Sequence, residues 1–318
     1  MSEVAREPRD GSAAYDVAVV GGGAAGLSAA VALLRFRRSV VVIDDGTPRN
    51  AAAGHVHNLF TRDGTPPAEL FNLGRAEVEH YGGGLVTGTV LSIEGSAGAF
   101  TVLLDNQAIA AHRIIVATGG RDELPDVSGL AARWGKDVVH CAFCHGYEVR
   151  DQRIGVLATG PMAVHQAMMF RLLSPPVTVL AHTAPPTDDQ RQDLAQRGIA
   201  VIPGTVAEVL SHHDHLTGVR MDDGNHVDLD ALVVSTVVRA RADFLAPLGL
   251  LPTDFMFNGQ VMATRIETGA NGATEVPGVW IAGNTSEPMA QVVNAAASGL
   301  AAASAIIAEI VSGQPIRQ

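Results

Sequence analysis

Cysteine is scarce in this chain of 318 residues: the only two, Cys141 and Cys144, lie in a single Cys-x-x-Cys. A secreted domain held together by disulfides would need more cysteines, spread along the chain. Aromatic residues make up only 4 % of the sequence, whereas glycine is abundant, with 34 residues. This composition argues against an aromatic-rich β-sandwich and favours helices packed closely on sheets.

Long apolar runs and an excess of positive charge are missing as well. No stretch reaches the roughly 18 apolar residues of a membrane span, and even Leu300–Val311 contains Glu309. Residues 1–14 are interpreted as a disordered leader, and Met1–Asp10 lacks the apolar run of a signal peptide. The net charge of −11 argues against a general binder of nucleic acids or anionic membranes. We therefore expect a cytoplasmic protein.

The remaining composition indicates a globular α/β protein, with 47 % hydrophobic and 17 % charged residues and enough length for two domains. A strand over Asp16–Val20 runs into the glycine-rich segment Gly21–Gly26. An apolar helix follows to about Arg37, and a second strand covers Ser39–Ile43. This order predicts the first βαβ unit of a dinucleotide-binding fold.

The glycine segment has the spacing Gly-x-Gly-x-x-Gly, in which each glycine has its own physical reason. Gly21 permits a tight turn, Gly23 lets the backbone approach a pyrophosphate, and Gly26 lets the helix and strand pack closely. Asp44, 18 residues after the last glycine, is placed to accept hydrogen bonds from a ribose, with Asp45 as the competing choice. A purely structural glycine turn is the alternative. The cofactor-binding candidates of this segment are Gly21, Gly23, Ala25, Gly26 and Asp44.

Two further segments resemble elements of flavoproteins that have two dinucleotide-binding domains. After a strand at Gly278–Ala282 come Gly283 and Asn284, then a long helix from about Met289. In those flavoproteins the strand ends at Gly-Asp beside the ribityl chain of FAD, and the helix that follows points its N-terminus at the flavin ring. Asn stands here in place of the usual Asp, and its amide can still bond a hydroxyl. The Ala-Thr-Gly turn at residues 117–119 resembles a third such element. The resemblance implies FAD as cofactor, with the further candidates Thr118, Gly119, Gly283, Asn284, Gln291 and Val292.

The Cys-x-x-Cys allows a redox-active disulfide, because a thiol at a helix start has a lowered pKa. His145 follows directly and can hold or deliver the proton that a thiol loses. Two alternatives remain, an inert buried pair and a zinc site. A structural zinc ion needs four ligands, however, and no second pair of cysteines or spaced histidines is obvious. We therefore expect no metal.

Along nearly its whole length the chain resembles the low-molecular-weight thioredoxin reductases, in which a domain carrying Cys-x-x-Cys is inserted into an FAD domain. Those enzymes usually have Asp directly after the second cysteine. The string Cys141-x-Phe143-Cys144-His145-Gly-Tyr-Glu is instead similar to that of dithiol oxidases that close disulfides in gliotoxin- and holomycin-type natural products. The resemblance implies that Cys141 exchanges with the substrate sulfur, that Cys144 lies nearer the flavin, and that His145 is the acid/base. It also implies a homodimer.

The inserted domain distinguishes between these two groups. A thioredoxin reductase would have Gly-x-Gly-x-x-Ala after the strand Ile154–Leu157, but the chain has Ala158-Thr-Gly160-Pro-Met-Ala. After the strand Val177–Leu180 comes Ala-His182-Thr-Ala, with no arginine to pair with a 2′-phosphate. We interpret this as a dinucleotide fold without its nucleotide, and a divergent NADPH site is the alternative. The predicted domains are 1–120 and 244–318, which together form a discontinuous FAD domain, and 121–243, inserted between them.

The sequence thus predicts an α/β protein with two Rossmann-like domains that acts as an FAD-dependent dithiol oxidase. Its substrate would be a small-molecule or peptide dithiol, and molecular oxygen would take the electrons and leave as H2O2. Residues near His55, His57 and Phe143 could line the cleft, although the two histidines could equally be solvated loop residues. One alternative is a disulfide reductase driven by NADPH or ferredoxin. Another is a flavoprotein or metal-binding module in which the cysteine pair is only structural.

Overall fold

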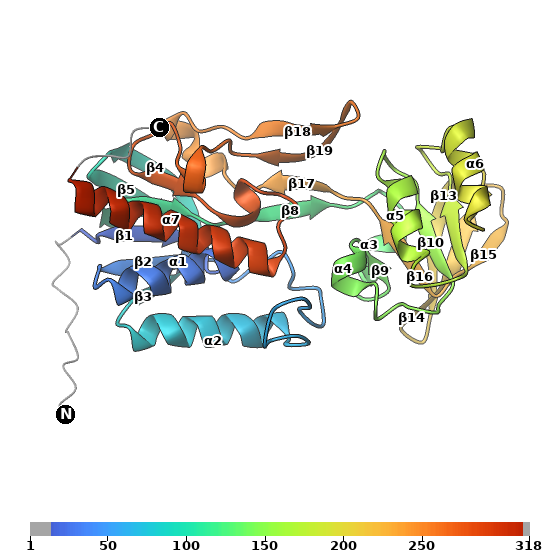
Figure 1. The fold of residues 1–318 in the computed structure, drawn as a ribbon, viewed down its shortest axis with the longest axis horizontal. Helices are drawn as coiled ribbons and strands as arrows, with labels where there is room; N and C mark the ends of the chain where they lie inside the picture. Colours follow the sequence, from blue (N-terminus) through green and yellow to red (C-terminus); the bar gives the residue numbers. More distant parts are fainter. Residues whose placement is uncertain (1–13, 314–318) are drawn as a thin grey trace.

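The computed structural model describes residues 14–313, so the predicted leader lies outside it apart from Ala14. Two α/β bodies lie side by side, and the chain crosses between them in the antiparallel strands β8 (Gly120–Glu123) and β17 (Val237–Ala240) (Figure 1). The first body is built from both ends of the described chain, and the second from its middle.

The first body is organised around a five-stranded parallel sheet in the order β20-β7-β1-β2-β3. Its central strand is buried at all four positions, as expected for a parallel strand covered on both faces. β20 comes from the C-terminal part and pairs with β7, so segments more than 160 residues apart in the sequence share this sheet. The elements are β1 (Val17–Val20), α1 (Ala24–Arg35), β2 (Val40–Asp44), α2 (Pro67–His80), β3 (Gly84–Thr87), β7 (Ile114–Val116), β20 (Val279–Ile281) and α7 (Val292–Ser312).

Alternate side chains of these strands enter two different cores. Val17, Val19 and Val42 pack under α1, α2 and α7, whereas Ala18, Val20 and other alternate residues face an antiparallel sheet. That second sheet consists of β4 (Val90–Ser96), β5 (Ala99–Leu104) and β6 (Ala108–Ala111). The result is a layer of helices, a parallel sheet and an antiparallel sheet.

Residues 84–96 connect the two sheets of the first body. The segment forms two strands, β3 and β4, which belong to different sheets. The chain turns between them at Gly88, whose N–H donates to the carbonyl of Asp44, and a Cβ at Gly88 would lie 2.8 Å from Leu104. Local periodicity does not reveal such a change of sheet, because both strands are short and apolar.

Helix α7 begins at Val292, three residues later than predicted, and is the one helix of residues 14–313 long and apolar enough to cross a membrane by length and composition. It packs across α1, where the backbone of Ala25 lies so close that a Cβ at Gly299 would be 2.0 Å from its carbonyl oxygen. This packing buries the face of α7 that carries Gly299, Ala302 and Ile306, whereas Leu300 and Val311 are exposed.

The second body repeats the layered plan. Its parallel sheet has the order β12-β11-β10-β16-β9, with α5 and α6 packed on one face and the sheet β13-β14-β15 on the other. The predicted strands at 154–157 and 177–180 are confirmed as β10 and β11. The elements are α3 (Leu130–Arg133), β9 (Val138–Val139), α4 (Ala142–His145), β10 (Ile154–Leu157), α5 (Ala163–Phe170), β11 (Val177–Leu180), α6 (Asp188–Gln196), β12 (Ala200–Ile202), β13 (Val206–His212), β14 (His215–Met221), β15 (His226–Asp228) and β16 (Ala231–Val234).

The crossing strands are extended by a hairpin into a four-stranded sheet of order β18-β19-β17-β8. The hairpin strands are β18 (Thr253–Phe257) and β19 (Gln260–Arg265), and short 3-10 helices lie at η1 (Asp243–Leu248), η2 (Ala270–Gly272) and η3 (Gly283–Thr285). The predicted fold class, two Rossmann-like α/β units with the first one discontinuous, is confirmed.

Candidate active site

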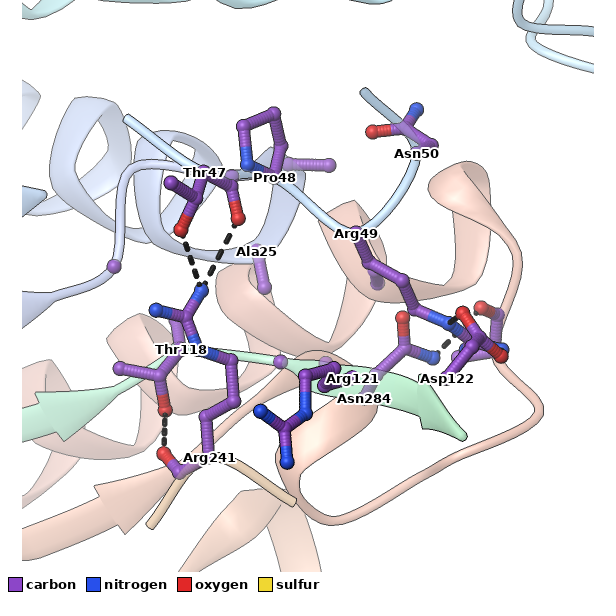
Figure 2. A pocket seen from close by; sticks show the side chains of 18 of the residues that line it. Ala25, Thr47, Pro48, Arg49, Asn50, Thr118, Arg121, Asp122, Arg241 and Asn284 are labelled. Carbon is purple, nitrogen blue, oxygen red and sulfur yellow. Dashed lines mark hydrogen bonds and ion pairs between the residues drawn. The ribbon is translucent and has the colours of Figure 1, made fainter. Parts of the chain in front are cut away.

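A cleft of about 1230 Å³ runs from the glycine turn of the first body to the cysteine pair of the second. That volume exceeds the roughly 300–1,000 Å³ of most small-ligand pockets. Figure 2 shows a part of its wall, in which Ala25 and Thr118 come from the first body and Arg121 and Asp122 from β8. Thirteen of the predicted site residues line the cleft: Gly21, Gly23, Ala25, Asp44, Thr118, Gly119, Cys141, Cys144, His145, Gly283, Asn284, Gln291 and Val292.

The exception is Gly26, which lies behind the turn and is required for packing. A Cβ there would lie 1.9 Å from the carbonyl oxygen of Gly21. Gly21 itself has φ +108°, and a Cβ on it would meet the Ala117 carbonyl at 2.3 Å. Both glycines therefore bring three backbone segments into contact, which any side chain would separate.

Gly23 differs from these two glycines because a Cβ built on it meets nothing within 4 Å. It is the N-cap of α1, and the first turn of that helix contains no acidic residue. The unpaired N–H groups of a helix start attract a phosphate. A backbone that leaves space at this point fits the close approach of a pyrophosphate, as the sequence predicts.

Asp44 ends β2 beside this turn, and its carboxylate already has two protein partners. It accepts a hydrogen bond from the N–H of Gly22 at 2.9 Å and an ion pair from Arg75 at 2.9 Å. Asp45, the competing choice for a ribose contact, pairs instead with Arg241 and caps the turn at Thr47. Of the two acids, Asp44 is the one bonded to the glycine turn.

The Asn284 amide explains why asparagine replaces aspartate in the second fingerprint. Its Nδ2 donates to the carbonyls of Glu287, Pro288 and Ala290 at 2.9–3.1 Å, which fixes the loop ahead of α7. A carboxylate would repel all three carbonyl oxygens. Within residues 14–313 the Oδ1 of Asn284 accepts no hydrogen bond, so this atom remains for a ligand hydroxyl.

We expect Asn284→Asp to weaken flavin binding about tenfold or more, because it removes the donor that three carbonyl oxygens share, two of them part-buried, at about 1–3 kcal/mol. The measurement is a titration of the apoprotein with FAD. Asn106→Asp, which adds the same charge at an exposed turn outside the cleft, is the matched control. Equal affinity in the two variants would contradict this role of the amide.

The Ala-Thr-Gly turn ties the end of the parallel sheet to the crossing strands. The Thr118 hydroxyl donates to the carbonyl of Arg241 at 2.5 Å, and the N–H of Gly119 donates to the Thr285 hydroxyl at 2.8 Å. The glycine has φ +69°, which favours glycine over other residues. The turn thus holds the exit of the first body against η3, next to Gly283.

The two cysteines occupy one short helix, with Cys141 as the N-cap of α4 and Cys144 inside it. The Cys144 thiol donates a hydrogen bond to the Cys141 sulfur, and the backbone N–H groups of Cys144 and Phe143 add to it. These donors outweigh the effect of burial and, with the charge of Arg49, lower the pKa of Cys141 from 9.0 to about 6. The same hydrogen bond, together with burial, raises the pKa of Cys144. The pair therefore has one thiolate, and it is Cys141.

His145 ends α4, and both of its ring nitrogens are buried with no hydrogen-bond partner among the described residues. Burial lowers its pKa, which the nearby Glu148 partly opposes, while the charges of His57 and His140 lower it further. The imidazole is therefore neutral near pH 7, and since it lines the cleft, it can accept a proton there.

Comparisons with known proteins agree with this combination of a dinucleotide turn and a dithiol. The sequence profile of the pyridine nucleotide-disulphide oxidoreductases matches residues 15–299. The chain belongs to this family. It is 30 % identical to "Thioredoxin reductase sirT" of Leptosphaeria maculans over 92 % of this chain and 93 % of that protein. It is 31 % identical to "Thioredoxin reductase tcpT" of Claviceps purpurea over 89 % and 90 %, respectively.

Solved structures of the family share the whole fold. The crystal structure of HlmI superposes with a TM-score of 0.86 and 42 % identity over 94 % of this chain and 93 % of that one. An oxidoreductase from Agrobacterium tumefaciens gives a TM-score of 0.88 with 33 % identity over 95 % and 100 %. The chain is thus a flavin-dependent thiol–disulfide oxidoreductase of the thioredoxin-reductase-like type, as the sequence predicts.

In this member of the family, Arg49 is a site residue that sequence reasoning missed. It forms a bidentate ion pair with Asp122 at 2.7 and 2.8 Å and donates to the Pro288 carbonyl at 3.0 Å (Figure 2). Burial alone would raise the pKa of Asp122, but the bonds and charge of Arg49 hold it below its usual value. Arg49 also lowers the pKa of Cys141. Its partner lies 73 residues away, so no local pattern could reveal it.

Gln166 of α5 is the second missed residue, and it fixes the chain just ahead of Cys141. It is 4 % exposed, its Nε2 donates to the His140 carbonyl at 3.0 Å, and its Oε1 accepts from the Ser235 hydroxyl at 2.7 Å. The His140 ring contacts the Val234 carbonyl at 3.1 Å. The N-cap of the cysteine helix is therefore held by the core of the second body.

The turn after β10, at residues 158–163, is the segment in which the sequence departs from Gly-x-Gly-x-x-Ala. The carbonyl of Ala158 accepts from the N–H of Ala184, so the loop after β11 folds over the end of β10. His182, in that loop, uses its Nδ1 to accept the N–H of Val206 at 3.1 Å. A Cβ at Gly160 would lie 3.1 Å from the Gln260 side chain of the β18–β19 hairpin. Protein groups thus lie close to Ala158, Gly160 and His182, the residues at which the sequence departs from a nucleotide-binding pattern.

Within residues 14–313, no group of three or more His, Cys, Asp or Glu side chains is placed to hold a metal ion.

Proposed function

We propose that this protein is an FAD-dependent dithiol oxidase, which converts a small-molecule or peptide dithiol and O2 into a disulfide and H2O2. The observation that carries the proposal is the single cleft that joins the flavin-type turn at Gly23 to the dithiol at Cys141 and Cys144. The departure of the second turn from Gly-x-Gly-x-x-Ala, with Ala158 in place of the first glycine, supports an enzyme whose electrons come from the dithiol.

The chain's residues that would hold FAD follow from the site. The open N-terminus of α1 at Gly23 would hold the pyrophosphate. Asp44 would accept hydrogen bonds from the ribose hydroxyls, and the free Oδ1 of Asn284 would accept one from a ribityl hydroxyl. When bound, the flavin accepts the two electrons of the cysteine pair and delivers them to O2, which is released as H2O2.

Substrate oxidation uses the Cys141–Cys144 disulfide. A substrate thiolate attacks the Cys141 sulfur, which forms a mixed disulfide and releases Cys144 as a thiolate. The second substrate thiol, once deprotonated, attacks the substrate sulfur of that mixed disulfide, so the substrate leaves as a disulfide and Cys141 as a thiolate. The proton of the second substrate thiol converts Cys144 back to a thiol, which again donates to the Cys141 sulfur. The pKa of Cys141 is then low, which makes it the better leaving group in this second exchange.

Proton transfer falls to His145 in this scheme. Its neutral, unpartnered imidazole accepts the proton that a thiol gives up when the pair is reoxidised. The charge of Arg49 stabilises the Cys141 thiolate.

The thiolate at Cys141 predicts a distinct pH dependence of alkylation. Because only the thiolate reacts, the rate with iodoacetamide rises as the pH rises through about 6 and is level at pH 8. An ordinary thiol would react fully only above pH 9. The measurement uses the fully reduced protein without oxygen, with the modified residue located by mass spectrometry. A rate that still climbs between pH 8 and 10 would contradict the assignment.

Oxygen uptake with a small dithiol tests the function itself. We expect one H2O2 for each disulfide formed, with no need for NADPH. The names of the relatives favour a second candidate, a disulfide reductase supplied by NADPH or ferredoxin. That enzyme would reduce a disulfide substrate and release no stoichiometric peroxide.

A further inference from the structure

Within residues 14–313 the chain passes between the two bodies only in β8 and β17, so other contacts must decide how closely α4 lies to the first body. Those contacts come from the loop between β2 and α2, residues 45–66. The loop has its own internal bridge, in which the N–H of Val56 donates to the carbonyl of Thr65 at 2.9 Å.

The tip of this loop contacts the cysteine helix directly. The Asn58 side-chain amide donates to the carbonyl of Phe143 at 2.6 Å. Phe143 lies between the two cysteines and is 67 % exposed as a residue, so the contact that Asn58 makes with it is to the backbone. Asn58 has φ +58°, a conformation that asparagine tolerates and that its N–H maintains by donating to Asp63 at 2.9 Å.

The neighbouring His57 makes a second contact with the same part of the second body. Its Nε2 lies 3.3 Å from a carboxylate oxygen of Glu148, and its Nδ1 lies 3.4 Å from Asp63 of its own loop. The imidazole thus links Asp63 of the first body to Glu148 of the second, three residues beyond His145. Its side chain is 21 % exposed, which limits screening by water.

Nearer β2, the same loop packs tightly on the second body. A Cβ built on Gly135, which has φ +80°, would lie 2.4 Å from the carbonyl oxygen of Ala52. Residues 52, 57 and 58 of this loop therefore contact residues 135, 148 and 143 of the second body, respectively.

We propose that Asn58 and His57 form an interdomain clasp that positions the Cys141–Cys144 helix against the flavin half of the cleft. They are positioning residues, since they act through α4 and not on the substrate. The inference rests on the proposed function, because the position of α4 affects electron transfer only if the dithiol reduces the flavin. A displacement of about 1 Å at a reacting group can cost up to roughly a hundredfold in rate, so a loosened clasp slows the step from dithiol to flavin.

The variant Asn58→Gly isolates the hydrogen bond, because glycine keeps the left-handed backbone without strain but lacks the donor. Asn258→Gly is the matched control: Asn258 also has a positive φ, of 46°, in the exposed turn of the β18–β19 hairpin. His57→Gln tests the second contact, and Arg62→Gln is its control in the same loop, at an exposed side chain.

Two measurements on the FAD-loaded protein test the clasp. Hydrogen exchange of the amides at 141–146 should accelerate in Asn58→Gly and His57→Gln, and stay at the wild-type rate in both controls. Stopped-flow reduction of the flavin by a dithiol should slow about 10- to 100-fold in Asn58→Gly. Reduction by dithionite, which needs no cysteine, should be unchanged, so a general loss of structure is distinguishable.

Wild-type exchange at 141–146 in both clasp variants would overturn the proposal, as would equal slowing by dithiol and dithionite. If dithiols fail to reduce the flavin even in the wild type, the dithiol oxidase function is wrong. The exchange measurement still decides the clasp in that case, because it does not depend on the substrate.

Discussion

Cys144→Ser should leave the flavin bound and slow its reduction by a dithiol about a thousandfold or more. A serine hydroxyl cannot form a disulfide with Cys141, and without the disulfide no exchange with the substrate begins. The groups that we propose to bind the flavin, at Gly23 and Asn284, do not include Cys144, so cofactor content should match the wild type. The measurement is the loss of the visible flavin band after a dithiol is added without oxygen.

Cys144→Ala tests whether the hydrogen bond from residue 144 lowers the pKa of Cys141. Serine keeps a donor to the Cys141 sulfur, whereas alanine removes the largest cause of its low pKa. Both variants should lose flavin reduction, but only Cys144→Ala should shift the alkylation of Cys141 to higher pH. Normal reduction of the flavin in Cys144→Ser would show that electrons bypass the pair.

A pair of glycine substitutions should separate flavin binding from folding. Gly26→Ala places a Cβ 1.9 Å from a backbone carbonyl, which has no flexible side chain to yield, so we expect a loss of about 3 kcal/mol in the free energy of unfolding. Gly23→Ala meets nothing within 4 Å and should leave the unfolding of the apoprotein unchanged. Its methyl group points into the space that a pyrophosphate needs, so FAD affinity should fall about tenfold or more.

Thermal unfolding of the apoprotein and titration with FAD measure the two effects. If Gly23→Ala binds FAD as tightly as the wild type, the pyrophosphate does not lie at this turn. If Gly26→Ala unfolds at the wild-type temperature, the packing explanation for that glycine is wrong.

Much of the fold could be predicted because strong local signals agree with it. The β1 strand, the glycine turn and α1 form one continuous pattern, and β10 and β11 are short apolar runs between clear breaks. The change of sheet at Gly88 has no local signal, because it depends on Leu104 and Asp44, which are distant in the sequence. The start of α7 was placed too early, because the loop ahead of it is held by the Asn284 amide and not by a local capping residue.

The site could be predicted in part for the same reason. Glycine spacing and Cys-x-x-Cys are local motifs, so those residues could be named, and all of them except Gly26 line one cleft. Arg49, Gln166 and Asn58 were missed, since each acts on a partner between 26 and 85 residues away. A single arginine, glutamine or asparagine has no pattern of its own, and its role follows only from the tertiary contact.

The most direct test of the central claim is an anaerobic visible titration of the FAD-loaded protein, first with NADPH, then with a small dithiol, then with air. The account predicts that NADPH leaves the flavin oxidised, that the dithiol bleaches it, and that air restores the colour with release of H2O2. Prompt bleaching by NADPH would contradict it, because the second dinucleotide turn would then bind its nucleotide and the protein would be a reductase.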